Sequence, residues 1–161
     1  MNFNSFTIKS QEAIQKAVEI TRQAGEQQIE PVHILKGLMD EGDSLVKFIF
    51  QKVGANPVAV VQQVEREIAS LPKVSGGEPY LSRTSNDVLQ KSLDIARQNG
   101  DEYVTLEALL MALFEINSSA STVLKDAGLS AGELKAAVDE LRKGKKATDQ
   151  SAEEQYNALS K

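Results

Sequence analysis

The sequence predicts an all-α protein in which two tandem four-helix repeats pack as one pseudo-twofold bundle. First, the sequence repeats itself at an offset of 75 residues. Second, apolar residues within each copy recur every three or four positions, which is the period of an amphipathic helix. Third, no segment alternates apolar and polar residues as a half-buried strand would. We assign repeat one to residues 6–70, a loop to 71–81 and repeat two to 82–143.

The repeat shows itself in identical residues at equivalent positions. A shift of 75 superimposes Ser10, Gln15, Lys16, Ile20, Arg22, Gln23, Gly25, Leu35 and Leu38 on Ser85, Gln90, Lys91, Ile95, Arg97, Gln98, Gly100, Leu110 and Leu113. Four helices seldom bury all of their apolar faces alone, so we expect the two copies to share one core.

The first helix of each repeat carries an apolar stripe, which in repeat one runs from Ala13 to Ala24. Thr7 and Ser82 precede these helices and suit the N-cap position, where a hydroxyl accepts a backbone N–H. Gly25 and Gly100 follow them, where a left-handed C-cap conformation favours glycine. Both helices are therefore expected to end at these glycines.

Three further helices follow in each repeat. Pro31 suits the first position of a second helix, because its missing N–H would have no partner there. Gly54 and Gly128 end the third helices, and Asn56 and Ser130 are N-cap candidates for the fourth. The apolar positions of these helices are Ile34, Leu35, Leu38, Leu45, Val46, Ile49, Phe50, Val60, Val64 and Ile68 in repeat one, and Leu109, Leu110, Leu113, Ala120, Val123, Leu124, Leu134, Val138 and Leu141 in repeat two.

Two segments lie outside the repeats. Residues 71–80 contain two prolines and two adjacent glycines, which predict a loop. Residues 144–161 begin with a polar stretch, and Ala152, Tyr156 and Leu159 then return to helical spacing. We expect this tail to be a linker that starts a new helix, and the chain to be a fragment of a longer protein.

Composition narrows the possible functions. The 161 residues are 41% apolar and 25% charged, as in one globular domain. Lys and Arg number 18 against 23 Asp and Glu, and this net charge of −5 argues against nucleic-acid binding, which needs clustered basic residues. There is no cysteine, hence no disulfide and no thiol chemistry. No apolar run approaches the roughly 18 residues of a membrane span, and no secretion signal opens the chain, so we expect a soluble, cytoplasmic protein without a membrane partner.

An enzyme active site is not expected. His33 is the only histidine, so a metal site would need carboxylates for every other ligand, and we expect a structural role for His33. The segment Lys143–Lys145 lacks the preceding glycine and the following Ser or Thr of a phosphate loop. We expect no catalytic residue, metal or cofactor in these residues. A small hydrolase or a metal-binding protein is the alternative from another functional class.

The duplicated pattern resembles the Clp amino-terminal domain family. The residues that carry the resemblance are Phe6-Thr7, Ala13-Ile14, Gly25, Ile29-Glu30-Pro31-Val32-His33-Ile34-Leu35 and Val104-Thr105-Leu106-Glu107-Ala108-Leu109-Leu110. The resemblance covers Phe6 to about Arg142. The tail from Asp149 to Leu159 looks like the junction before the first ATPase module in the disaggregase branch of this family, and unlike the corresponding join in protease-associated relatives.

The resemblance implies a mobile module of a hexameric AAA+ chaperone. In the family, such a domain binds exposed apolar segments of unfolded or aggregated proteins during the stress response. It has no catalysis of its own, whereas the parent uses ATP and Mg²⁺, forms a homohexamer and cooperates with other chaperones. The alternative within the family is an adaptor-docking domain of a protease-associated unfoldase.

The resemblance also implies a polar patch for substrate handling at Thr7, Asp101 and Glu107. The simpler interpretations are a helix cap for Thr7 and solvated surface acids for Asp101 and Glu107, and for Thr7 the two roles are compatible. Val32 stands where the family often has a glutamate in the first copy. Recognition of phosphoarginine, for which relatives use the glutamate of both copies, is therefore not expected.

Apolar contacts to a bound peptide are expected near the junction of the two halves. The candidates are Leu89, Ile95, Leu106 and Leu110. The alternative for each is a place in the core, because an apolar position on a helix is usually buried. A shallow apolar groove would bind weakly and with little sequence preference, since burial contributes only about 25 cal/mol per Å² before the costs of ordering are subtracted.

Overall fold

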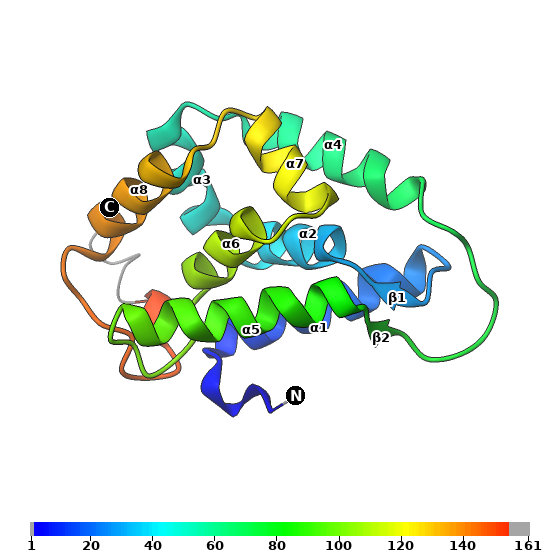
Figure 1. Cartoon of the computed structure of the whole chain (residues 1–161), viewed down its shortest axis with the longest axis horizontal. Coiled ribbons are helices and arrows are strands. Elements are labelled where there is room, and N and C mark those ends of the chain that lie inside the picture. Colours follow the sequence, from blue (N-terminus) through cyan, green and yellow to red (C-terminus); the bar gives the residue numbers. More distant parts are fainter. Residues whose placement is uncertain (1, 155–161) are drawn as a thin grey trace.

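The computed structural model describes residues 2–154 and confirms the all-α class (Figure 1). Its elements are η1 (Phe3–Ser5), α1 (Ile8–Gln23), β1 (Gln28–Ile29), α2 (Pro31–Glu41), α3 (Asp43–Val53), α4 (Pro57–Ala69), β2 (Tyr80–Leu81), α5 (Arg83–Gln98), α6 (Leu106–Glu115), α7 (Ser119–Asp126) and α8 (Ala131–Arg142). The two strands, of two residues each, depart from the expectation of a chain without strands. They are too short to produce an alternating pattern in the sequence.

The predicted caps of the first helices are confirmed. The hydroxyl of Thr7 accepts the N–H of Ser10 at 3.1 Å, and that of Ser82 accepts the N–H of Ser85, also at 3.1 Å. After these helices, Gly25 adopts φ +72° and Gly100 adopts φ +75°, so the C-terminal turns take the left-handed form that favours glycine. Equivalent residues of the two repeats therefore begin and end the first helices in the same way.

The pseudo-twofold relation is also visible in two short parallel strand pairings, each of which joins one repeat to the other. β1 pairs in parallel with β2, so that Ile29 lies beside Leu81. Phe6 pairs in parallel with Val104. A shift of 75 residues converts Phe6 into Leu81 and Ile29 into Val104, so the two pairings are equivalent. The start of each repeat is thus hydrogen-bonded to the loop after the first helix of the other.

Helix packing follows the same symmetry and produces one shared core. Across the halves, α3 packs on α8 as α7 packs on α4, and α1 packs on α6 as α5 packs on α2. α2 and α6, the two second helices, contact each other in the middle of the molecule (Figure 1). The largest fully buried side chains are Phe6, Ile34, Leu35, Leu38, Ile49, Phe50, Leu89, Leu106, Leu109, Leu110 and Leu113.

The segment that follows α8, residues 143–154, lies against the domain and is called the strap below. Its residue Ala147 accepts the N–H of Glu102, and Gln150 accepts the N–H of Ile8, both at 2.9 Å through backbone carbonyls. Ala147 and Ala152 are buried. The expected linker therefore begins as a docked segment, and the part of its predicted helix at Tyr156 and Leu159 lies outside the described residues. Within residues 2–154, no helix is long and apolar enough to cross a membrane.

Candidate functional site

Thr7, Asp101 and Glu107, the predicted polar site residues, lie in one buried group. They come from the start of α1, the loop before α6 and the first turn of α6. Arg142 at the end of α8 and Glu153 of the strap complete what we call the polar cluster. All five side chains are buried, with Thr7 fully inaccessible and Glu107 at 1% exposure. The structure brings the predicted residues together but places them beneath the strap.

Arg142 joins two of the acids. Its guanidinium donates to both carboxylate oxygens of Asp101, at 2.8 and 2.7 Å, in the bidentate geometry that gives the strongest such pairs. Its Nε lies 3.3 Å from Oε2 of Glu107. Asp101 also accepts the N–H of Ala147 at 3.0 Å, which attaches the strap to the same ion pair.

Glu153 joins the strap to two helix N-termini. Its Oε2 accepts the hydroxyl of Thr7 at 2.6 Å and the N–H of Leu106 at 3.0 Å. Leu106 is the first residue of α6, where a backbone N–H has no partner within its own helix. Thr7 therefore caps α1, as predicted, and also anchors the strap.

Two carboxyl groups of the cluster are shifted toward the protonated form. The pKa of Glu107 is raised to about 7, mainly by burial and also by the nearby Glu153 carboxylate, while Arg142 acts in the opposite direction. Burial also raises the pKa of Glu153, against the lowering effect of its hydrogen bonds from Thr7 and Leu106. Among the described residues, no hydrogen bond is completed at either oxygen of Glu107 or at Oε1 of Glu153, and the Nε of Arg142 meets Oε2 of Glu107 only as an ion pair.

Sequence reasoning missed Arg142 and Glu153. Arg142 aligns with Ile68 of repeat one at an offset of 74, and Ile68 is a core residue. A charged residue opposite a core position was thus a usable signal for Arg142. Glu153 gave no such signal, because it lies in a polar tail without a counterpart in the first repeat.

The four predicted apolar contacts lie at different depths. Leu89 and Leu110 are inaccessible and belong to the core in this conformation. Leu106, 1% exposed, borders a cavity of about 120 Å³ beside Glu153. Ile95, 4% exposed, is also buried but borders a larger open groove. The prediction that these residues contact a peptide stays a prediction.

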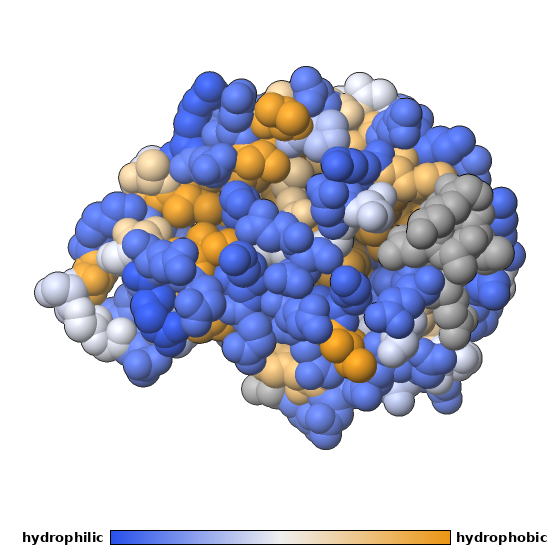
Figure 2. Space-filling model, turned by 180° about the vertical axis from the view of Figure 1, so that it is seen from behind, coloured by the Kyte–Doolittle hydropathy of each residue, from blue (hydrophilic) through white to orange (hydrophobic). Residues whose placement is uncertain are grey.

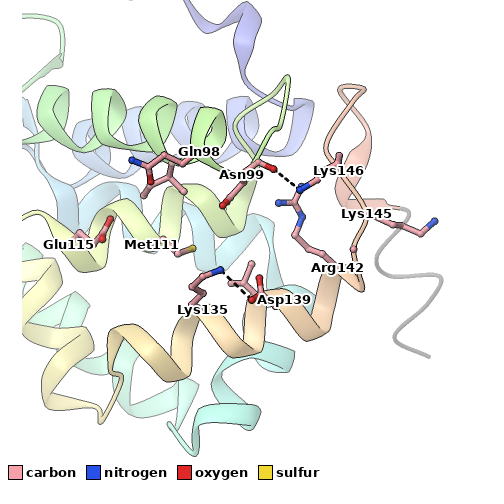
Figure 3. Close-up of a pocket in the computed structure, with 12 residues that line it drawn as sticks. Gln98, Asn99, Met111, Glu115, Lys135, Asp139, Arg142, Lys145 and Lys146 are labelled. Carbon is pink, nitrogen blue, oxygen red and sulfur yellow. Dashed lines mark hydrogen bonds and ion pairs between the residues drawn. The ribbon is translucent and has the colours of Figure 1, made fainter.

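The groove that contains Ile95 lies between α5, α6, α8 and the strap and has a volume of about 540 Å³ (Figure 3). We call it the second-repeat groove. Its apolar lining consists of Met111, which is partly exposed, and of Ile95 and Val138, which are buried beneath it. Its rim is charged: Lys135 pairs with Asp139 at 3.3 Å on α8, and Lys146 of the strap donates to the carbonyl oxygen of Asn99 at 2.8 Å (Figure 3).

Repeat one has an equivalent hollow of about 300 Å³. Its residues Ile20, Ala24, Lys36, Glu65 and Ile68 correspond to Ile95, Asn99, Met111, Asp139 and Arg142 of the second-repeat groove. A separate hollow of about 710 Å³, the first-repeat groove, lies between α2, α3 and α4. From behind, the surface is mostly hydrophilic, and apolar side chains gather mainly on the side where α4 ends (Figure 2). The apolar surface is therefore divided among several shallow hollows.

His33 occupies a second buried polar group in repeat one. Its Nδ1 accepts the N–H of Glu30 at 2.8 Å, and its Nε2 lies 2.7 Å from Glu26, so Nε2 carries the proton. Burial lowers the pKa of His33, and the Glu26 carboxylate opposes this only in part. Glu26 corresponds to Asp101 at the offset of 75 and also pairs with Lys73 of the inter-repeat loop. His33 has the structural contacts expected of it, and no group of three potential metal-ligating side chains occurs among residues 2–154.

Comparison with known proteins identifies the relatives of the chain. Residues 5–127 match the Clp repeat (R) N-terminal domain family. The whole chain is 55% identical to chaperone protein ClpB of Bacteroides thetaiotaomicron and 53% identical to that of Porphyromonas gingivalis, and it spans 19% of the length of each. The crystal structure of the Hsp104 N-terminal domain from Candida albicans covers 93% of this chain and 99% of its own, with a TM-score of 0.83 at 26% identity. Fold and sequence thus agree on the same relatives.

Proposed function

Because the chain belongs to the Clp repeat N-terminal domain family, we propose that it is the substrate-binding module of a ClpB-type protein disaggregase. It captures exposed apolar segments of unfolded or aggregated proteins and delivers them to the rest of the parent. The parent is a cytoplasmic AAA+ ATPase of the stress response that uses ATP and Mg²⁺, forms a homohexamer and cooperates with other chaperones. Nucleotide chemistry belongs to other parts of the parent, because these 161 residues contain no phosphate-loop motif.

The second-repeat groove is the observation that supports this proposal best. Inside a charged rim, its apolar floor consists of the partly exposed Met111 and the buried Ile95 and Val138. An unfolded segment offers apolar side chains and backbone groups, which suit an apolar floor and a polar rim respectively. A groove of this size buries little area, so dissociation constants of tens of micromolar or weaker are expected. Weak, sequence-tolerant capture is what a general chaperone needs.

The predicted site residues take different places in this proposal. Ile95 borders the second-repeat groove but is only 4% exposed, so it contacts the bound segment through a small accessible edge of its side chain. Leu89, Leu106 and Leu110 contact it only in a conformation that exposes them, since all three are buried here. Thr7, Asp101 and Glu107 act through the polar cluster beneath the strap.

A second candidate function is docking of a specific adaptor protein, and the first-repeat groove favours it. This groove carries Val58, which is 64% exposed, beside Met39 and Val61. Its rim includes the ion pair between Lys47 and Asp43 at 3.0 Å. An exposed apolar residue beside charges in fixed positions suits one folded partner protein with complementary charges better than a range of unfolded proteins.

Replacement of Met111 by lysine tests the proposal without disturbing the fold. The equivalent residue of repeat one is Lys36, which pairs with Asp40 at 2.8 Å, and Glu115 stands where Asp40 stands. Met111→Lys should therefore fold and pair with Glu115. Losing the burial of this side chain, worth about 1 kcal/mol, should weaken binding of a reduced and alkylated unfolded protein about fivefold in an NMR titration.

Two matched variants separate the candidates. Met111→Leu keeps the apolar surface and should bind the unfolded protein like the parent sequence, while Val58→Ser alters only the first-repeat groove and should leave that binding unchanged. If the unfolded protein causes no shift changes, or if Val58→Ser weakens binding while Met111→Lys does not, capture in the second-repeat groove is wrong. Stoichiometric capture of one folded partner that depends on Val58 would support adaptor docking.

A further inference from the structure

The strap completes hydrogen bonds that the two halves of the domain leave open. Ile8 and Leu106 are the first residues of α1 and α6, and their N–H groups have no partners within their own helices. The strap supplies both acceptors, the carbonyl of Gln150 for Ile8 and the carboxylate of Glu153 for Leu106. In the other half, Pro31 occupies the position equivalent to Leu106 and has no N–H to satisfy. The strap therefore supplies hydrogen-bond acceptors that are needed at the N-terminus of α6 but not at that of its counterpart α2.

The same contact brings together more negative charge than the interior can balance. Among residues 2–154, the carboxyl groups of Asp101, Glu107 and Glu153 in the polar cluster face one guanidinium, that of Arg142. Asp101 already takes the two terminal nitrogens of that guanidinium. Glu107 and Glu153 retain buried oxygens at which no described donor completes a hydrogen bond. Two buried carboxyl groups in such a position are more stable with a proton on one of them.

The groups around this pair do not remove the imbalance. Lys9 on α1 is a cation near Glu153 that lowers its pKa, and it lines the small cavity beside Glu153. Glu41 at the end of α2 and Asp43 at the start of α3 line the same cavity and offset it. From α8 the nearest charge is that of Arg142.

We propose that the strap is a pH-dependent cover: it docks while a proton is held in the buried Glu107–Glu153 pair and detaches when that proton passes to solvent. Detachment uncovers the hydroxyl of Thr7, the carboxyl group of Glu107 and the N-terminus of α6. It also removes a wall of the second-repeat groove, since Gly144, Lys145 and Lys146 line it. The inference does not depend on the proposed function, because strap docking is measured without any substrate.

The direction of the pH effect follows from linkage. The pKa of Glu107 is about 7 with the strap docked, against an ordinary value of 4.5. A group whose pKa is raised in the docked form favours docking fully below its ordinary pKa, and that contribution is lost as pH rises through the docked value. If the pKa of Glu107 returns to its ordinary value on release, the docking equilibrium constant falls about tenfold from pH 6 to pH 8. The raised pKa of Glu153 acts in the same direction.

Amide hydrogen exchange of the 161-residue chain tests the proposal. The reporters are the N–H groups of Ile8, Glu102 and Leu106, which belong to the body of the domain but donate to the strap. Their protection factors, each referred to the unstructured rate at the same pH, should fall about tenfold from pH 6 to pH 8. Those of Leu110 and Leu113 in the middle of α6 should not change.

Charge-neutral variants give the decisive comparison. Glu107→Gln removes one charge of the pair while Arg142 keeps its bidentate partner Asp101, so the fall in reporter protection from pH 6 to pH 8 should become clearly smaller and continue only through Glu153. Glu154→Gln alters the exposed neighbour of Glu153 and should retain the response of the unaltered chain. Glu153→Ala removes the anchor and should lower reporter protection at both pH values, with Leu110 unaffected. The proposal is wrong if the reporter protection factors of the unaltered chain are the same at pH 6 and pH 8. It is also wrong if a folded Glu107→Gln variant shows the same fall in protection as the unaltered chain.

Discussion

Arg142 shows how a single side chain can make a buried acidic group tolerable. It holds Asp101 through two hydrogen bonds and lies beside Glu107, and all three side chains are buried. Isolated buried charges are costly because they lose their hydration, and a paired guanidinium offsets much of that cost. The stability of the cluster therefore depends on this pairing more than on either acid alone.

Replacing Arg142 by methionine should lower the free energy of unfolding by about 3–5 kcal/mol, because two buried acids would lose their cation. Chemical denaturation monitored by circular dichroism measures this change. Arg66→Met is the matched control: Arg66 is an exposed residue in the last turn of α4 whose side chain meets Gln63, and its loss should cost less than about 0.5 kcal/mol. Equal stabilities for the two variants would mean that Arg142 does not compensate the acids.

For single residues, it was easier to predict which residues form the polar cluster than whether their side chains are buried. The family resemblance implies one polar patch of Thr7, Asp101 and Glu107, and these residues do lie together, although Asp101 and Glu107 are not the solvated surface acids of the simpler interpretation. Their burial could not be predicted, because it depends on the strap, whose polar residues resemble a solvated linker. Contacts between segments far apart in the chain leave no periodic signal in either segment.

Among the helices, α1 and α2 pack more closely than their counterparts α5 and α6. The reason is the size of the facing residues. A Cβ on Gly37 of α2 would lie 2.3 Å from the carbonyl oxygen of Ala13 on α1. Ala112 and Val88 occupy the equivalent positions of repeat two, where the larger side chains hold the helices apart. The helix pairs of the repeats thus share a topology but differ in separation.

Gly37→Ala should destabilise the domain by about 1–3 kcal/mol, because the backbone of α1 cannot move away without disturbing the core. The control is Gly132→Ala in α8, where a Cβ would meet nothing within 4 Å. That substitution should stabilise the protein by up to about 1 kcal/mol through helix propensity alone. Thermal unfolding measures both changes, and a neutral Gly37→Ala variant would show that the helices can separate freely.

Element boundaries were largely predictable, since caps and glycines are local signals. Pro31 begins α2, Asn56 caps α4 and Ser130 caps α8, as expected. The short strands were not predictable, because two residues carry no detectable alternation and their pairing joins different repeats.

At the scale of the whole molecule, the exchanged contacts make the two halves one folding unit. Phe6 of repeat one lies without solvent exposure beside Val104 of repeat two, and Lys52 on α3 pairs with Glu140 on α8 at 2.9 Å. The core runs through both repeats without a break. The duplication in the sequence predicted the twofold arrangement, but not which segments the halves exchange.

A core substitution in one repeat should therefore weaken the other equally. Leu124 on α7 is inaccessible, and Leu124→Ala should cost about 2–5 kcal/mol. If the domain unfolds as one unit, the slowest-exchanging amides of α1 and α2 should lose the same free energy of protection as those of α5 and α6. Loss confined to repeat two, in hydrogen exchange near neutral pH, would contradict a single unit.

The docked strap also sets how far the domain can stand from whatever follows it in the chain. While residues 144–154 are bound to the body, they contribute almost nothing to the tether. Once peeled away, these eleven residues can extend by roughly 35–40 Å. A pulling force applied to the chain after Glu153 would break the hydrogen bonds of the strap one at a time. The bonds of Glu153 would break first, then the backbone bond at Gln150 and then the one at Ala147. Undocking of the strap would thereby lengthen the connection to the next part of the chain at low force, while the helices of the domain stay folded.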